Sequence, residues 1–243
     1  QAFDFWWLHN HHNCELQIGG SDQWGNIAQG VDLVRRRNGN AVHGLTWPLI
    51  TRSDGQKYGK SIDGAIWLDP NLTLPYEFHQ YWLSVDDRDV RKFLMQLTLM
   101  SLEEIDAVVV EHEKSPENRY GQQRIADEIT TLVHGADAAA KARLAADALF
   151  GTGELTSEML IALEGVVPKT PVQRSILSGD EALIDLLVHS ELTASKSEAR
   201  RLLKQGGVSV NREKRSTADI DPMALIGGRF LLVQKGKKQR NLI

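Results

Sequence analysis

Apolar and polar positions along the first part of the chain switch between helical and extended patterns. Residues Gln1 to Asn13 read as the end of a helix, although their apolar side chains are too dense for one clean stripe. Cys14 to Ile18 and Ala41 to Ile50 read as extended segments. Between them, Ile27 to Arg37 reads as a helix that stops at Asn38-Gly39. Strand, helix and strand in this order predict one α/β crossover.

After Pro75 the pattern becomes helical, and short polar breaks separate stretches with apolar residues at helical spacing. These stretches are Tyr76 to Leu83, Asp87 to Met100, Leu102 to Glu113, Pro116 to Leu132 and Asp137 to Leu149. Pro116 fits the first turn of its helix, where proline is well tolerated. The pattern predicts a helical bundle, and the Gly-, Thr- and Pro-containing stretch from Gly151 to Gly179 predicts a linker.

The last sixty or so residues combine short helices with strands. Ala182 to His189 predicts a short apolar helix, and Ser195 to Glu198 has the pattern of a capping box that starts a second helix. Gly206 to Asn211 leads into a strand, and Gly228 to Gln234 reads as a final strand before the basic run Lys235 to Arg240. From Glu181 onwards twelve Lys/Arg face seven Asp/Glu, whereas the rest of the chain is acidic. A basic terminal region on an acidic body indicates that this region meets a polyanion.

Composition limits the class of protein. The chain has 243 residues, 42% of them hydrophobic and 25% charged, which is ordinary for soluble globular material. No apolar run approaches the ~20 residues that cross a bilayer. The single Cys14 excludes an internal disulfide framework and fits a reducing compartment. We therefore expect a cytoplasmic protein without a membrane partner.

Two loops carry the candidate chemistry. The first, Gly19 to Asn26 (Gly-Gly-Ser-Asp-Gln-Trp-Gly-Asn), follows an apolar run and leads into a helix, so its glycines allow a ligand close to the backbone. The second, Lys57 to Ser61 (Lys-Tyr-Gly-Lys-Ser), places two lysines around a glycine, which suits charge developing on a phosphate. Together, in this order, they indicate nucleotide chemistry.

These loops resemble the bacterial tyrosyl-tRNA synthetases, which are class I enzymes. The resemblance covers essentially the whole chain and implies a multidomain α/β plus α plus α+β protein. It implies a partial Rossmann-like catalytic domain at 1–74, a helical anticodon-binding domain at 75–150, a linker at 151–180 and an RNA-binding module at 181–243 like that of ribosomal small-subunit protein four. The HIGH tetrapeptide of the family is not in this sequence, so we expect a C-terminal portion that is inactive by itself.

The resemblance also assigns roles around the first loop. Gln1 would contact the amino group of tyrosine, Asp4 its phenol hydroxyl, and Gln23 the tyrosine side of the pocket. Gly20 and Asp22 would face the ribose of the adenylate. The first two residues lie three apart and can share one helix face. A plain helix terminus, or a simple N-cap at Asp22, is the alternative for these positions.

For the second loop, the resemblance implies that Lys57 and Lys60 stabilise the pyrophosphate leaving group, and that Ser61 adds a hydroxyl contact. Such catalysis works by positioning and charge without a protein nucleophile. ATP would be a substrate accompanied by Mg²⁺, and no tightly bound cofactor or dedicated metal ligand is expected. A solvated basic loop is the alternative.

The basic residues of the terminal region are candidates for RNA contact: Arg200, Arg201, Lys204, Lys235, Lys237 and Lys238. Phosphate contacts of this kind supply affinity and register. The resemblance implies that the partner is tRNA(Tyr), with its anticodon stem on the helical domain and its long arm near the terminal region, and that the full-length protein is a homodimer. A merely solvated surface is the alternative.

Three further interpretations stay open. His9, His11, His12 and Cys14 could suggest zinc, but their spacing does not converge on one point, so we expect no metal site. A non-catalytic RNA-binding protein on a synthetase scaffold would not need Asp22, Gln23 or the lysines. An enzyme of the same fold for tryptophan is disfavoured by the basic terminal region.

Overall fold

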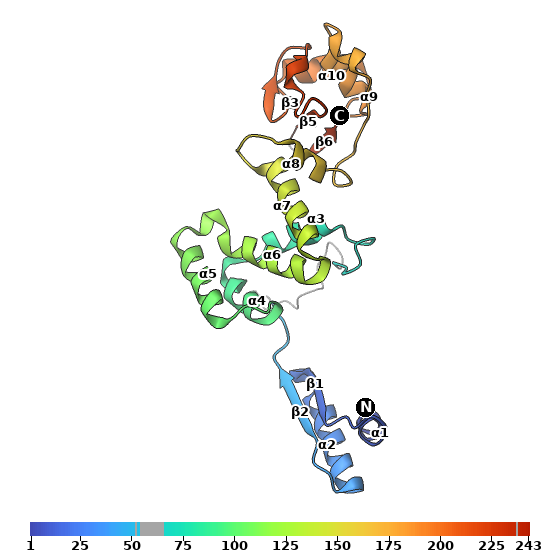
Figure 1. Cartoon of the computed structure of the whole chain (residues 1–243), viewed down its shortest axis with the longest axis vertical. Helices are drawn as coiled ribbons and strands as arrows, with labels where there is room; N and C mark the ends of the chain where they lie inside the picture. The colour runs from blue at the N-terminus through green and yellow to red at the C-terminus, as the bar shows by residue number, and fades with distance from the viewer. Residues whose placement is uncertain (52, 54–65, 237) are drawn as a thin grey trace. The chain divides into compact units, whose positions relative to one another are not determined.

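The computed structural model describes residues 1–51, 53, 66–236 and 238–243. The chain divides into two compact units, Gln1–Ala65 and Ile66–Ile243, which we call the first and the second unit. Figure 1 shows their elements along the chain. Among the described residues, no helix combines the length and apolar character required to cross a membrane.

The described residues of the first unit form two helices and a two-stranded parallel sheet, which Figure 1 shows. Its elements are α1 (Ala2–His12), β1 (Leu16–Gly20), the 3-10 turn η1 (Ser21–Gln23), α2 (Trp24–Asn38) and β2 (His43–Trp47). The strands pair in parallel from Leu16↔His43 to Gly20↔Trp47. Helix α2 ends at Gly39, whose φ of 72° is the left-handed conformation that favours glycine. The predicted α/β crossover is therefore confirmed.

Two glycines, which have no side chain, let the helices of the first unit approach their neighbours closely. A Cβ on Gly44 of β2 would lie 2.5 Å from Cγ2 of Ile27, and one on Gly30 of α2 would lie 2.9 Å from Cδ1 of Phe5. Ile27 thus packs directly on the sheet, while Phe5 of α1 packs on α2. Phe5 forms a small core with Val34 and Val42, all at most 5% exposed.

The other face of the sheet is apolar and exposed. Leu16 and Ile18 of β1 and Leu45 and Trp47 of β2 are each 45–57% exposed. The register places Ile18 beside Leu45, so these side chains form one continuous surface.

The second unit begins with a bundle of five helices, which we call the helical region. Its helices are α3 (Pro75–Leu83), α4 (Val90–Leu97), α5 (Leu102–Lys114), α6 (Tyr120–His134) and α7 (Ala136–Phe150). Short 3-10 turns, η2 (Asp87–Asp89) and η3 (Pro116–Asn118), precede α4 and α6. Each predicted helical stretch is present, but the one from Asp87 begins as a 3-10 turn and ends at Leu97 instead of Met100, and the one from Pro116 is interrupted. The interruption before α6 is Arg119, whose φ is 55° and whose guanidinium donates to the carbonyls of Leu83 and Val85.

The segment interpreted as a linker contains helix α8 (Ser157–Ala162) and the 3-10 turn η4 (Arg174–Ser178). Leu160 and Leu163 are fully buried there, in one cluster with Ala145 and Ala148 of α7 and with Phe230. The segment therefore packs against α7, which precedes it in the chain, and against Phe230, which follows it.

The remaining residues form what we call the C-terminal region, two helices with a four-stranded antiparallel sheet. Its elements are α9 (Ala182–His189), α10 (Lys196–Lys204), β3 (Val208–Val210), β4 (Glu213–Arg215), the 3-10 turn η5 (Pro222–Ala224), β5 (Leu232–Lys235) and β6 (Gln239–Leu242), with strand order β4-β3-β5-β6. The predicted helix Ala182 to His189 is confirmed.

The strand predicted within Gly228 to Gln234 is present as β5, but the prediction that it is the final strand is wrong. The basic run after it includes the turn between β5 and β6, and β6 continues the sheet to Leu242. The polar sequence Gln239-Arg240-Asn241 hid this strand, but Asn241 is only 3% exposed and its amide donates to the carbonyl of Ser190.

Gly121 offers a direct test of packing in the helical region. A Cβ there would lie 2.5 Å from Cγ1 of Val90, a stiff β-branched side chain on α4. We expect Gly121→Ala to lower the free energy of unfolding by about 1–3 kcal/mol, even after the gain in helix propensity. Urea unfolding followed by circular dichroism measures this. Gly179→Ala, with no atom within 4 Å of the new Cβ, is the matched control; equal stabilities of the two variants would contradict the packing.

Asp127 of α6 should make the stability of the helical region depend on acid. Burial alone would raise its pKa, but the hydrogen bond and charge of His79 and the charge of Arg143 hold the pKa below its ordinary value. His79 Nε2 lies 2.9 Å from Asp127 Oδ1, and His79 is 3% exposed. Because the folded-state pKa of Asp127 is depressed, its ionised carboxylate stabilises the folded state. This stabilisation is fully present above the unfolded pKa of ~3.9 and is lost as pH falls through the folded-state pKa.

We expect Asp127→Asn to lower the free energy of unfolding by about 1–3 kcal/mol at pH 7. The difference from the unchanged chain should vanish at pH values below the folded-state pKa. Urea midpoints measured from neutral to strongly acidic pH provide the test, with Asp106→Asn as a control because its ion pair with Arg91 is exposed. A difference that persists unchanged in acid would refute the linkage.

Candidate functional site

The first candidate site lies at the carboxyl edge of the parallel pair. Both strands point toward the same edge, where Gly20 pairs with Trp47. The turn η1 starts directly after Gly20, so Asp22 and Gln23 lie at this edge, immediately before α2. In open α/β sheets, ligands bind outside the carboxyl ends of the strands. Asp22 and Gln23, two predicted site residues, thus lie at the edge where ligands bind in sheets of this kind.

Hydrogen bonds link the side chains of this corner. Gln23 Nε2 donates to Asp22 Oδ2 at 3.1 Å, and Asn26 Nδ2 donates to Gln23 Oε1 at 3.1 Å. These contacts orient the carboxylate and the amide together, and Asp22 remains exposed to solvent. The corner can therefore accept hydrogen bonds from hydroxyl or ammonium groups of a ligand.

Gly20 leaves room for the carboxylate of Asp22. A Cβ at this residue would lie 2.6 Å from Asp22 Oδ1 and 3.0 Å from Cδ2 of Leu49. Any side chain would push the carboxylate away or block the approach to it. This steric reason for glycine supports the sequence interpretation that the backbone is left open here for a ligand.

Gln1 and Asp4 lie on another element of the first unit, at the start of α1. The side chain of Asp4 is 77% exposed, while the neighbouring Phe5 points into the core. Within the described residues, no hydrogen bond joins Asp4 to Asp22 or Gln23. Helix α1 contacts α2, so both predicted parts of the site belong to one packed unit.

Lys57, Lys60, Ser61 and Lys237 lie outside the described residues. What the structure does define is the strand that leads to the lysine loop. Strand β2 ends at Trp47, the residue paired with Gly20. The chain therefore leaves the sheet at the same edge that carries Asp22.

The histidines of α1 have local structural partners. His9 is 8% exposed, with Nδ1 3.1 Å from the carbonyl of Cys14 and Nε2 3.0 Å from the amide of Asn40. His11 contacts the carbonyl of Trp7 and stacks on its ring. In the described part of the chain, no group of three or more His, Cys, Asp or Glu could hold a metal ion.

The predicted RNA-contacting residues divide into paired and unpaired cations. Arg200 forms a two-pronged ion pair with Glu181, with N–O distances of 2.7–3.0 Å. Lys235 Nζ donates to the carbonyl of Leu192 at 2.7 Å and to Glu198 at 2.9 Å. Arg201, Lys204 and Lys238 are exposed, and no hydrogen bond or ion pair within the described residues holds their charged groups.

The start of α10 explains why Lys235 is engaged. Ser195 Oγ accepts from the backbone N–H of Glu198 at 3.2 Å, as the capping pattern predicts. Glu198 bonds the N–H of Ala194 at 2.9 Å instead of that of Ser195. The hydrogen bond from Lys235, followed by that from Ala194, lowers the pKa of Glu198. Lys235 thus joins β5 to the helix start, which a linear sequence could not reveal.

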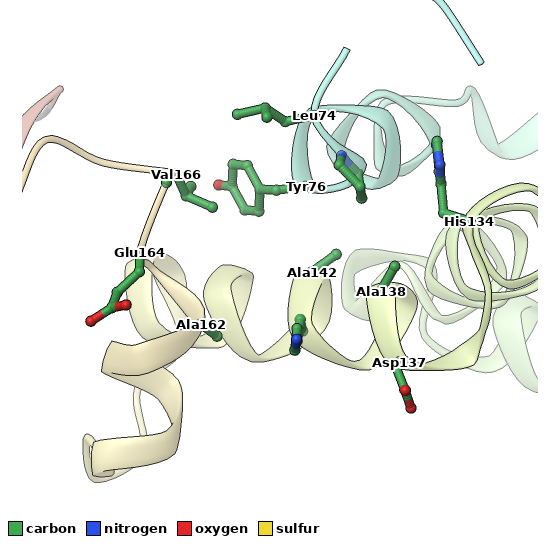
Figure 2. Close-up of a pocket in the computed structure, with 12 residues that line it drawn as sticks. Leu74, Tyr76, His134, Asp137, Ala138, Ala142, Ala162, Glu164 and Val166 are labelled. Atoms are coloured by element: carbon green, nitrogen blue, oxygen red, sulfur yellow. The ribbon is translucent and has the colours of Figure 1, made fainter. Parts of the chain in front are cut away.

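The second unit contains a cavity of about 380 Å³ that the sequence did not predict (Figure 2). It is lined by α3, α7 and the turn after α8, and the carboxylates of Asp137 and Glu164 point away from it. Tyr76 lies within it, and burial raises the pKa of its hydroxyl against the opposing charge of Arg240. No sequence signal could find this cavity, because its walls come from elements far apart in the chain.

Comparison with known proteins agrees with these observations. The family described as "tRNA synthetases class I (W and Y)" matches residues 1–151. The domain described as "Tyrosine--tRNA ligase SYY-like C-terminal domain" matches residues 163–243. Both residues 1–151 and residues 163–243 therefore match domains found in tRNA synthetases.

Similar curated proteins are named tyrosine–tRNA ligase. That of Streptomyces avermitilis is 45% identical over 241 residues, covering 98% of this chain and 57% of the relative. That of Bacteroides thetaiotaomicron is 42% identical over 252 residues, covering 100% of this chain and 59% of the relative. The chain thus spans less than two thirds of the length of these relatives.

Solved structures give the same result. The C-terminally truncated mitochondrial tyrosyl-tRNA synthetases of Coccidioides posadasii and Aspergillus nidulans are 32% and 31% identical, with TM-scores of 0.51 and 0.53. These matches cover 58% and 61% of this chain, and 41% and 42% of the respective structures. On the extent of the family match and the identity to these relatives, the chain belongs to the class I tRNA synthetases of the tryptophan and tyrosine group.

Proposed function

We propose that this chain is part of a tyrosine–tRNA ligase, which activates tyrosine with ATP and transfers it to tRNA(Tyr). The observation that carries the proposal is the Asp22–Gln23 corner, held open by Gly20 at the carboxyl edge of a parallel pair. It occurs in a chain whose residues 163–243 match a C-terminal domain specific to tyrosine–tRNA ligases. These two features support the proposal of part of an active site and of a tRNA-facing region in this chain.

In the proposed reaction, a carboxylate oxygen of tyrosine attacks the α-phosphorus of ATP. The new bond gives tyrosyl-adenylate, while the bond to the β-phosphate oxygen breaks and pyrophosphate leaves. Lys57 and Lys60 stabilise the charge on pyrophosphate, with Ser61 beside them, and Mg²⁺ enters with ATP. Asp22 and Gly20 face the ribose, and Gln23 faces the amino acid.

Asp4 and Gln1 account for the choice of amino acid. A carboxylate that accepts a hydrogen bond from the phenol hydroxyl favours the binding of tyrosine. When an aromatic side chain without that hydroxyl enters, the carboxylate is left unpaired, which disfavours binding. The carboxylate of Asp4 is 77% exposed on α1, where it lies 3.4 Å from the amino group of Gln1. Gln1, one turn earlier, would bond the amino group.

For RNA, we propose that the C-terminal region acts like the module of ribosomal small-subunit protein four. Two helices packed on a small sheet, with Arg201 and Lys204 on the exposed side of α10, support this assignment. The anticodon stem would contact the helical region and the long arm would contact α10. The full-length protein would act as a homodimer.

Tyrosine-dependent ATP–pyrophosphate exchange by the full-length protein tests the catalytic proposal. We expect exchange with tyrosine and not with tryptophan. Gly20→Ala should lower kcat/KM for tyrosine activation at least ~10-fold, because its Cβ displaces Asp22. Gly179→Ala, in the second unit, should leave it unchanged. Exchange with tryptophan alone, or full activity of Gly20→Ala, would reject this reading of the site.

The exposed lysine of α10 tests the RNA proposal. We expect Lys204→Ala to weaken tRNA(Tyr) binding and to reduce the slope of log K against log salt by about 0.7–0.9, the loss of one phosphate contact. Fluorescence titrations at several salt concentrations measure this slope. Lys169→Ala is the matched control, because its ammonium is already paired with Glu164 at 2.6 Å. Identical slopes for Lys204→Ala and the unchanged chain would exclude this residue from the RNA contact.

A further inference from the structure

Arg212 joins the C-terminal region to the end of helix α7. Its Nε donates to the carbonyl of Ala148 at 3.1 Å and its Nη1 to the carbonyl of Gly153 at 2.6 Å, while Nη2 donates to the carbonyl of Asp147. One guanidinium therefore serves three backbone carbonyls that lie 59 to 65 positions earlier in the chain. Only the planar, forked donor set of arginine makes such a contact.

The turn that carries Arg212 is itself held in place. Arg212 and Asn211 connect β3 to β4 with φ values of 70° and 49°, as in a two-residue hairpin turn. Asn211 Nδ2 donates to the carbonyl of Ala224 at 2.7 Å, and its Oδ1 accepts from the N–H of Leu232 at 3.0 Å. The guanidinium is thus presented from a turn fixed by β5.

Arg240 of β6 provides a second contact at the same helix end. Its Nη2 donates to the carbonyl of Leu149 at 3.3 Å, and its guanidinium carbon lies 4.9 Å from the ring centre of Phe150. The two arginines come from the β3–β4 turn and from β6 of one sheet, and they reach successive carbonyls of α7.

The last turn of an α-helix suits such a contact. Its final carbonyls lack partners within the helix and carry the negative end of the helix dipole, so cations are stabilised there. Helix α7 ends at Phe150, and Arg212 and Arg240 donate to the carbonyls of Asp147, Ala148 and Leu149, of which that of Asp147 also accepts from the N–H of Gly151. The apolar cluster of Ala145, Ala148, Leu160, Phe230 and Leu242 packs across the same junction.

We propose that Arg212 and Arg240 are positioning residues that clamp the C-terminal region onto α7 and so fix α10 relative to the helical region. This inference rests on the proposed tRNA binding. An RNA that contacts both the helical region and α10 binds more tightly only if it can contact both at the same time. A fixed position of α10 relative to the helical region keeps the effective concentration of the second contact high. Neither arginine needs to touch RNA for this effect.

The first test measures the clamp without RNA. Spin labels at Glu103→Cys on α5 and Ser216→Cys after β4, in a Cys14→Ser background, report the distance between the two regions. We expect a narrow distance distribution for the parent and a broad one for Arg212→Ala/Arg240→Ala. Arg212→Lys should give an intermediate width, because an ammonium lacks the forked donors. A distribution as narrow in the double variant as in the parent overturns the clamp.

The second test measures RNA binding by the same variants. We expect the double variant to bind tRNA(Tyr) at least ~10-fold more weakly, whereas its affinity for an isolated long-arm hairpin should stay within ~2-fold. Arg215→Ala removes the same charge from the same hairpin, where its partner is the exposed Glu213 at 3.7 Å. It should therefore leave the distance distribution unchanged.

The outcomes separate the two proposals. A broad distribution with undiminished tRNA affinity refutes the positioning role, and so does equal weakening for tRNA and hairpin, which would mean that the arginines contact RNA directly. Failure of the parent chain to bind tRNA contradicts the proposed function instead. In that case the distance measurement alone still decides whether the clamp exists.

Discussion

The second unit depends on the close approach that the alanines of α7 permit. Ala139, Ala142, Ala145 and Ala148 recur every three residues, and each is at most 5% exposed. Because they are small, α3, α6 and α8 can all contact this one helix. The carbonyl end of the same helix then receives Arg212 and Arg240. Helix α7 therefore connects the helical region to the C-terminal region by packing along its length and by hydrogen bonds at its end.

In the first unit, glycines perform the corresponding task. Gly44 lets Ile27 of α2 lie directly on the sheet, and this packing holds the first turn of α2 against β2. The start of α2 in turn sets the place of Asp22 and Gln23 at the carboxyl edge of the strands. The site thus follows from packing: a side chain at Gly20 or Gly44 would move the corner without altering any polar residue in it.

The charged residues of the C-terminal region show how packing sorts groups that look alike in sequence. Arg200 and Lys235 carry the same formal charge as Arg201 and Lys204, yet they are held by Glu181 and Glu198. A cation whose donors are already satisfied gains less from a phosphate than an exposed one, because it must first give up its partner. The surface available for the proposed RNA contact is therefore narrower than the count of basic residues indicates.

The sequence by itself determined the local features of this protein. Helical spacing located α3, α5 and α9, Ser195 marked the start of α10, and the Gly-Gly-Ser-Asp-Gln-Trp-Gly-Asn loop identified the corner and its family. These are short-range signals, because they depend on neighbours within a turn or a strand. The positions of Lys57 and Lys60 relative to that corner remain a prediction.

Only the tertiary structure decided which distant residues meet. Strand β6 was missed because Asn241 and Arg240 are polar, and their burial depends on Ser190 and on α7. No sequence pattern singles out Arg212, yet its partners lie about sixty positions away at and just after a helix end. Periodicity carries no information about such pairs, because a backbone carbonyl looks the same in every sequence and becomes a binding group only where the fold leaves it unpaired.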